Sequence, residues 1–241
     1  RMLKGGILED GLVQASEEGT PQGSILSPLL SNIYLHYVLD LWFSRVVRPH
    51  CRGEAYYCRF ADDFVACFQY QQDAQQFMDA LSERLEQFRL SLAQEKTRCL
   101  EFGRFARENA RRRGEKPREF TFLGFTHYCG KTKNGYFKVK RRTSRNKLGA
   151  SLRAFADWAN RARRELTKGE MLRRAKARVK GHLNYYAITD NAQCCSRFIY
   201  YATRILRKWL NRKSQRKAYN WNQMNQALDW IGWPSVRIGI D

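Results

Sequence analysis

Two adjacent carboxylates, Asp62 and Asp63, stand between two aromatic-rich stretches of the chain, 55–60 and 64–68. These stretches alternate loosely and indicate two strands joined by a tight turn. Carboxylates in an apolar hairpin lose hydration. A divalent cation such as Mg²⁺ is the usual compensation, because it prefers hard oxygen ligands. The alternative is an ordinary exposed acidic turn, and the pair taken alone favours that alternative.

Three further groups of residues flank this pair along the chain. Pro21-Gln22-Gly23 precedes it, where an amide side chain can hydrogen-bond to a base or ribose and a glycine permits close backbone approach. Lys96 follows it and could neutralise a triphosphate or protonate a leaving pyrophosphate, although a solvated lysine fits equally well. Phe122-Leu123-Gly124-Phe125 comes last. At least one of its phenylalanines is expected in the core.

Charge is distributed unevenly between the two parts of the chain. Residues 1–102 carry 10 Lys and Arg against 14 Asp and Glu, whereas residues 103–241 carry 34 against 9. A net charge of +25 over the second part is hard to explain as solvated helix faces alone. The contrast indicates a carboxylate site joined to a surface that binds a polyanion.

The seven cysteines are scattered, and no pair has the spacing of a zinc-binding motif. We therefore expect reduced thiols rather than a disulfide framework or a zinc site. The most apolar stretch, 26–43, is interrupted by polar residues, so no membrane span is predicted. A hydrophobic content of 43% excludes wholesale disorder.

Hydrophobic spacing predicts the elements that position these residues. Ser27-Pro28 is typical of a helix start, and apolar residues then recur at helical spacing to residue 42. A helix is expected over 73–88, strands over 97–102 and 119–125, and a mobile basic loop over 103–118. From about residue 143 the pattern predicts helices only, with stripes over 148–162, 172–186 and 198–209 and a short helix after Asn222.

The order of these motifs resembles the second half of the palm of a reverse transcriptase. Phe60–Asp63 is similar to the aromatic-Ala-Asp-Asp hairpin of that family. The resemblance implies that Asp62 and Asp63 are catalytic and bind two Mg²⁺ ions, with Mn²⁺ as an alternative. It also implies that Pro21, Gln22, Gly23 and Lys96 contact the nucleotide and template, and that the primer is supported by Phe122, Leu123, Gly124 and Phe125.

The second part narrows the resemblance to group II intron reverse transcriptases. The stretches 181–186, 207–216 and 233–238 are similar to the thumb, or maturase X region, of that family. Basic residues there can track phosphates and tyrosines can stack on unpaired bases. Aromatic residues on helical stripes usually belong to the core, as expected for Trp209 and for one of Tyr185 and Tyr186. The predicted RNA-binding residues are Arg141, Arg142, Arg145, Lys180, Tyr185, Arg207, Lys208, Arg212, Lys213 and Arg216.

The predicted fold class is α+β, a partial reverse-transcriptase palm with an antiparallel sheet and helices, followed by an all-α thumb bundle. The expected domains are a palm over 1–126, a linker over 127–147 and a helical thumb or X-like domain over 148–241. A polymerase palm needs another metal-binding carboxylate from an earlier strand, and Asp10 lies in a turn-like setting that does not provide it. The chain alone is therefore expected not to polymerise, and a fingers and palm segment is an expected partner.

The sequence supports two functions that do not exclude each other. The first is an RNA-directed DNA polymerase of group II intron type that also promotes splicing, with intron RNA, RNA template, DNA primer and dNTP as partners. The second is a non-catalytic RNA-binding splicing factor. A domesticated or defence-associated reverse transcriptase shares the palm motifs, and only the thumb resemblance argues against it. The expected location is the bacterial cytoplasm, within a ribonucleoprotein or the nucleoid. An organellar location is the alternative.

Overall fold

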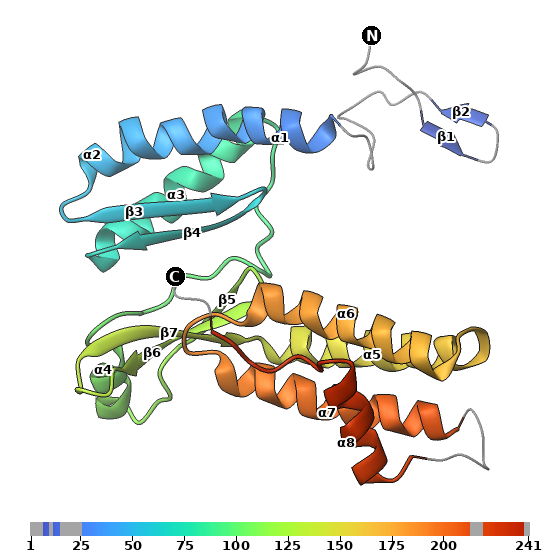
Figure 1. The fold of residues 1–241 in the computed structure, drawn as a ribbon. Helices are drawn as coiled ribbons and strands as arrows, with labels where there is room; N and C mark the ends of the chain where they lie inside the picture. Colours follow the sequence, from blue (N-terminus) through green and yellow to red (C-terminus); the bar gives the residue numbers. More distant parts are fainter. Residues whose placement is uncertain (1–6, 10–11, 15–25, 213–218, 239–241) are drawn as a thin grey trace. The chain divides into compact units, whose positions relative to one another are not determined.

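The computed structural model describes residues 7–9, 12–14, 26–212 and 219–238. The chain divides into two compact units, Arg1–Leu100 and Glu101–Asp241. Their contents agree with the predicted α+β class, because small antiparallel sheets come first and several long helices follow (Figure 1).

The first unit is built around a β-hairpin. The short strands β1 (Ile7–Glu9) and β2 (Leu12–Gln14) pair antiparallel. Helix α1 (Ser27–Leu35) begins one residue before Pro28. It continues through two wide, π-type turns, His36–Asp40 and Phe43–Val47, into α2 (Arg48–His50). Strands β3 (Ala55–Phe60) and β4 (Asp63–Phe68) form the hairpin, and α3 (Gln71–Gln87) follows.

One face of the hairpin is covered by helices. Alternate residues share a face of a strand, and Ala55 and Tyr57 of β3 lie with Phe64, Ala66 and Phe68 of β4 in the core of this unit. The helices contribute Leu35, Val38, Leu39, Phe43, Phe77, Leu81 and Leu85. The opposite face of the hairpin is largely exposed, including Phe60 at its end.

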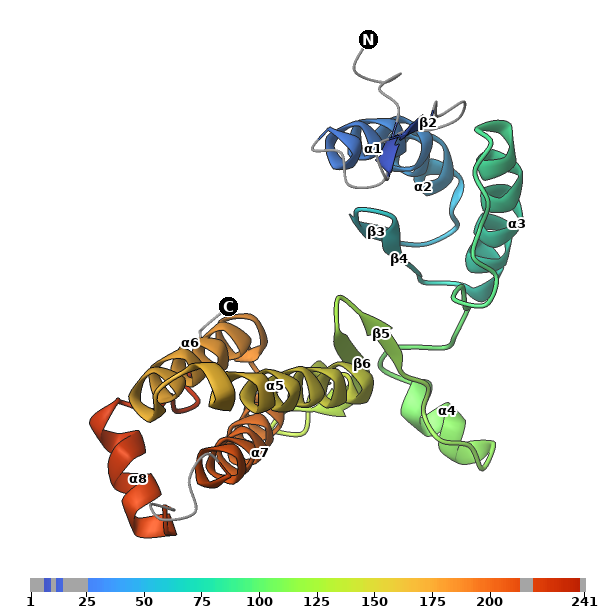
Figure 2. The same ribbon diagram turned by 90° about the vertical axis from the view of Figure 1, so that its right-hand side faces the viewer.

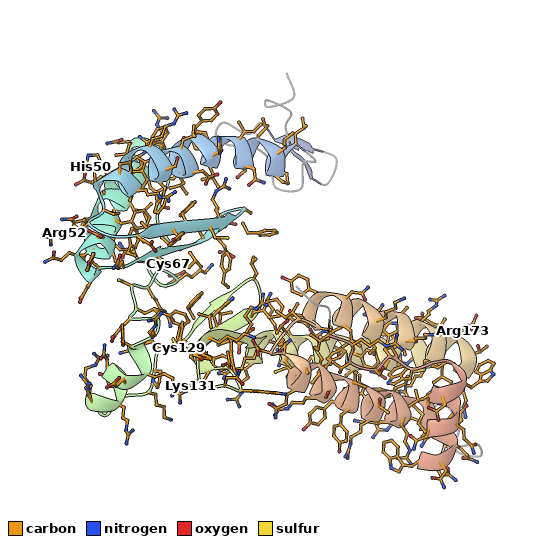
Figure 3. The ribbon with its side chains drawn as sticks, turned by 60° about the vertical axis from the view of Figure 1, so that its left-hand side comes forward. His50, Arg52, Cys67, Cys129, Lys131 and Arg173 are labelled. Carbon is orange, nitrogen blue, oxygen red and sulfur yellow. The ribbon has the colours of Figure 1, made fainter. Side chains whose placement is uncertain are left out.

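The second unit begins with a small sheet. Helix α4 (Ala106–Arg112) precedes strands β5 (Phe120–Phe122), β6 (Phe125–Lys131) and β7 (Phe137–Thr143), which form an antiparallel sheet in that order. Cys129 lies on β6 (Figure 3) and is buried. Its sulfur accepts a hydrogen bond from the Gly103 backbone N–H at 3.3 Å. All seven cysteines are free thiols.

Four helices complete this unit. Helices α5 (Arg145–Glu165), α6 (Lys168–Tyr186) and α7 (Ala192–Asn211) pack on one another, and α8 (Trp221–Trp230) lies across the end of the bundle (Figures 1 and 2). The predicted stripes form its core. Reciprocal capping bonds at Thr167–Glu170 and Asn220–Gln223 satisfy free N–H groups at the starts of α6 and α8. The buried core residues include Phe155, Trp158, Met171, Val179, Leu183, Phe198, Leu206, Leu210, Met224 and Leu228.

Three local predictions are wrong. Residues 97–102 form no strand, since their backbone joins none of the sheets among the described residues. Glu101 instead accepts hydrogen bonds from Asn109 and Arg113, and Phe102 packs edge-on against Phe120. The basic stretch 103–118 contains α4, since Ala106 and Ala110 form a buried face that the surrounding charges concealed. The range 127–147, expected as a linker, contains most of β6, all of β7 and the start of α5.

Candidate active-site turn and nucleic-acid interface

The two carboxylates lie at the tip of the β3–β4 hairpin. Phe60 pairs with Asp63, so Ala61 and Asp62 form a two-residue turn. Ala61 adopts a φ of 54°, which L-residues rarely adopt and which hairpin turns of this length require. Both aspartates are exposed. The turn therefore presents two adjacent carboxylates to solvent from a strained but regular hairpin.

Arg59 holds this turn and is a residue that sequence reasoning missed. Its Nη1 donates to the Ala61 carbonyl oxygen at 2.7 Å and to Asn32 Oδ1 at 3.0 Å. Its Nε and Nη2 donate to the two carboxylate oxygens of Asp40 at 2.7 and 2.6 Å. The guanidinium therefore joins the strained turn to the helical segment that covers the hairpin.

The Arg59–Asp40 pair is partly withdrawn from water, with side chains 9% and 28% exposed. The hydrogen bonds from Arg59 lower the pKa of Asp40 below its ordinary 3.8, against an opposing effect of burial, and the same bonds raise the pKa of Arg59. Asp40 closes the first π-type turn. Such turns often mark functional positions in helices, and this one presents the carboxylate that orients Arg59.

The acidic turn fits part of a magnesium site. Asp62 and Asp63 supply hard oxygen ligands, and neither forms a salt bridge with another described residue. Across the described ranges, no group of three or more His, Cys, Asp or Glu side chains is placed to hold a metal ion. The chemistry of the pair therefore fits two ligands of such a site, which further oxygen atoms would have to complete.

The predicted nucleotide-contacting residues are only partly described. Pro21, Gln22 and Gly23 lie outside the described residues. Lys96 is exposed in the turns that follow α3, where its backbone N–H donates to the Ala93 carbonyl at 3.0 Å. No contact among the described residues joins Lys96 to the acidic turn, so its predicted role stays a prediction.

The predicted primer-supporting residues form a second hairpin turn, between β5 and β6. Phe122 pairs with Phe125, and the two turn residues have positive φ, 49° at Leu123 and 80° at Gly124. The Leu123 carbonyl accepts a hydrogen bond from the Tyr185 hydroxyl at 2.9 Å. A side-chain carbon at Gly124 would lie 3.0 Å from the Tyr186 hydroxyl. Both the backbone conformation and the neighbouring tyrosine therefore favour glycine there.

Helix α6 thus holds the second turn through two adjacent tyrosines. Phe125 is buried, as expected of one phenylalanine, and stacks on Tyr185 with ring centroids 5.7 Å apart. Tyr186 is half-buried and Tyr185 is 52% exposed. Since the Tyr185 hydroxyl and one ring face serve the turn, its predicted contact with RNA rests on the remaining ring surface.

The predicted RNA-binding residues of the sheet and α6 have different surroundings. Arg142 pairs with Glu119 at 2.6 Å and lies over the Tyr128 ring at 4.9 Å. Arg145 and Lys180 are exposed at the start of α5 and on α6, and Arg141 is half-buried in β7. The structure therefore leaves Arg145 and Lys180 more accessible to a polyanion than Arg141.

The remaining predicted RNA-binding residues lie on and after α7. Arg207 and Lys208 belong to its last two turns, and Arg212 is the residue that caps its C-terminal end. Lys213 and Arg216 lie outside the described residues. Trp209 is half-buried and packs against the bundle core, and Lys208 and Arg212 approach its ring at 5.3 and 5.2 Å. Two nearby residues were missed by sequence reasoning. They are Arg204, one turn before Arg207, and Trp221, which begins α8.

None of the helices among the described residues has the length and apolar character that crossing a membrane requires.

Comparison with known proteins gives matches to parts of the chain. Protein YkfC of Escherichia coli (strain K12) is 38% identical over 27% of this chain and 24% of that protein. Group II intron-encoded protein LtrA of Lactococcus lactis subsp. cremoris is 58% identical over 17% of this chain and 8% of that protein. The chain thus spans about a quarter or less of the length of these relatives.

The family comparison covers the region that carries the acidic turn. Residues 8–127 match the family model described as reverse transcriptase (RNA-dependent DNA polymerase). The matched range includes the β3–β4 hairpin and the Phe122–Phe125 turn. Residues 8–127 are therefore similar to the reverse transcriptase family.

Proposed function

We propose that this chain is part of an RNA-directed DNA polymerase of group II intron type. The observation that carries the proposal is the exposed Asp62–Asp63 turn, held by Arg59 inside the segment that matches the reverse transcriptase family. Two adjacent carboxylates at a rigid turn suit nucleotidyl transfer, because such catalysis relies on positioned charge rather than on covalent chemistry with the protein.

Each predicted residue has a role in this proposal. Asp62 and Asp63 bind Mg²⁺, which when bound neutralises charge on the reacting phosphate oxygens. The segment Pro21–Gly23 and Lys96 contact the incoming nucleotide and template. The Phe122–Phe125 turn supports the primer end, and its hold by Tyr185 keeps that support in a fixed relation to α6.

The group II intron assignment rests on the local match to LtrA and on the basic helices. In this assignment, residues 1–126 are the C-terminal part of the palm and residues 148–241 are the thumb or X-like domain. Intron RNA is then a partner in addition to template and primer. The protein is proposed to work in the cytoplasm as a ribonucleoprotein.

A further palm segment completes the active site in this proposal. The β3–β4 hairpin is a two-stranded sheet among the described residues. Such a sheet is marginally stable alone and its outer edges can pair with another strand. A strand added at an edge is a suitable source of the additional metal-binding carboxylate. We propose that a fingers and palm segment supplies it.

Primer extension tests the polymerase proposal. Extension of oligo(dT) on poly(rA) with Mg²⁺ is measured for the chain alone and for the chain with a fingers and palm segment supplied in trans. We expect extension only with the added segment, and its loss in Asp62→Asn and in Asp63→Asn. Asp79→Asn, on the exposed side of α3, is the matched control and should retain activity. Extension that survives both turn variants would remove the metal assignment.

A second function, RNA binding in splicing, is favoured by the exposed cations at the C-terminal end of α7. Lys208 and Arg212 are exposed and lie beside an aromatic ring, as in surfaces that track RNA. Charge reversal at Arg207 and Arg212 should weaken RNA binding and splicing, whereas Asp62→Asn should leave both intact. Splicing that is unchanged by the reversals would count against this role. A domesticated reverse transcriptase would instead retain extension and show no intron-RNA preference.

A further inference from the structure

The side chains along one face of α7 combine cations and aromatic rings without any acid. The helix contains no Asp or Glu over its whole length, Ala192–Asn211. Tyr200, Tyr201, Arg204, Arg207 and Lys208 recur at three- and four-residue spacing, which places them along one face. Within the part of the chain that the structure describes, no salt bridge neutralises these cations.

A shallow hollow of about 380 Å³ lies on this face. That volume is near the lower end of sites for small molecules. It is lined by two aromatic residues, three cations and one aliphatic residue: Tyr201, Trp221, Arg204, Arg207, Lys208 and Ile205. The hollow therefore presents aromatic surface and positive charge within the reach of one small group.

Hydrogen bonds fix the part of the hollow formed by Arg207 and Trp221 before any ligand binds. The Tyr219 carbonyl accepts hydrogen bonds from Arg207 Nε at 3.1 Å and Asn211 Nδ2 at 3.0 Å, and the Tyr219 N–H donates to Asn211 Oδ1 at 2.7 Å. The Asn220–Gln223 capping bonds then set the start of α8. As a result Trp221 lies with its ring 4.4 Å from the Arg207 guanidinium. Such preorganisation lowers the entropic cost of binding.

The charge and the rings together select the ligand. Positive groups without acidic partners favour a polyanion. Exposed rings, Tyr201 and Trp221 here, favour a planar group with open faces. A base inside a duplex is stacked on both faces and cannot enter such a hollow, whereas an unpaired base can stack on an aromatic ring while cations contact its phosphates.

We propose that this hollow binds an unpaired nucleotide of RNA. Trp221 and Tyr201 contact the base, and Arg204 and Lys208 contact the adjacent phosphates. The proposal rests on the proposed RNA-binding role and deepens it, because it names single-stranded RNA as the ligand and α7–α8 as its site. It also makes Trp221 and Arg204 specificity residues.

Fluorescence anisotropy of the full chain with labelled oligouridylate and with a labelled RNA duplex tests the proposal. Trp221→Ala should weaken oligouridylate binding by about tenfold or more, from the usual contribution of base stacking. Its effect on duplex binding should stay below about twofold. Trp230→Ala is the matched control, because Trp230 lies on the same helix, is 78% exposed and does not line the hollow. Equal losses in the two tryptophan variants would overturn the proposal.

A variant on α7 tests the same hollow without changing α8, so its effect does not depend on whether α8 folds correctly. Arg204→Gln should lower the salt dependence of oligouridylate binding by about one phosphate contact. Arg197→Gln removes the same charge from α7 away from the hollow and should have the smaller effect. Equal effects, or competition by polyglutamate as strong as by oligouridylate, would overturn the RNA ligand. A wild-type chain that binds neither RNA would instead remove the proposed RNA-binding role itself.

Discussion

Two hairpin turns of this protein each hold a non-glycine residue at positive φ, and different side chains stabilise them. Each connects two strands with two residues, and each places a non-glycine residue at positive φ, Ala61 at 54° and Leu123 at 49°. In each, the carbonyl of that residue accepts a hydrogen bond from a side chain, at 2.7 Å from Arg59 and at 2.9 Å from Tyr185. Strained residues of this kind persist only when the surroundings hold them.

The difference lies in the chemistry of the anchor. Arg59 is a charged group withdrawn from water that depends on Asp40, whereas Tyr185 is neutral and its turn is also confined by the Tyr186 hydroxyl near Gly124. The acidic turn is therefore held by charge and leaves both carboxylates free. The second turn is held by packing and leaves little room around its glycine. Removal of charge should affect the first turn, and addition of volume the second.

Arg59→Met gives the largest expected effect. The variant keeps much of the side-chain volume but leaves Asp40 partly buried with only the exposed His36 imidazole beside it, at 3.2 Å. This change should lower the free energy of unfolding by about 3 kcal/mol. Urea unfolding followed by hydrogen exchange of the β3–β4 amides measures the loss. Arg112→Met removes an exposed ion pair with Glu108 and should change little. A similar loss in both variants would show that the Arg59 network does not hold the first turn.

The two units should lose stability over different pH ranges, because different groups titrate in each. Burial lowers the pKa of His182, which packs against Tyr186 and Phe198, to about 4. Since the unfolded chain binds a proton near pH 6.5, the second unit should lose roughly 2 kcal/mol as the pH falls from 6.5 to 4. The pKa of Asp40 lies below 3.8, so its contribution to the first unit is lost only as the pH falls below 3.8.

Hydrogen exchange over a pH series measures this separation. The amides of α6 should lose protection between pH 6.5 and 4, and those of β3 and β4 should lose the Asp40 contribution only below that range. His182→Gln should flatten the dependence of α6. A wild-type α6 that stays equally protected across this interval would contradict the assignment to His182.

Local patterns predicted the elements that carry the two turns better than they predicted the anchors. The aromatic stretches around Asp62 and Asp63 predicted the hairpin, and helical stripes predicted α5, α6 and α7. The contact between Arg59 and Asp40 joins residues 19 apart, and that between Tyr185 and Leu123 joins residues 62 apart. No local period encodes such contacts, because they depend on how a helix packs against a strand or turn.

Gly124→Ala tests the steric confinement of the second turn. The new side chain meets both a positive φ and the Tyr186 hydroxyl, so the expected cost is about 2 kcal/mol. Gly135→Ala is the matched control, since Gly135 has a φ of 83° and no atom within 4 Å of the added carbon. Its cost should reflect the backbone alone. Equal costs in urea unfolding would show that Tyr186 does not confine the turn.

Tyr185→Phe has the smallest expected effect and isolates the neutral anchor. The ring can still stack on Phe125 while the hydrogen bond to Leu123 is lost, which should cost about 1 kcal/mol. Tyr136→Phe, at a highly exposed tyrosine of the same unit, should cost nothing measurable. If the second turn supports a primer, Tyr185→Phe should slow primer extension in the complemented enzyme and leave RNA affinity unchanged. Loss of RNA affinity in this variant would instead assign the hydroxyl to RNA rather than to the turn.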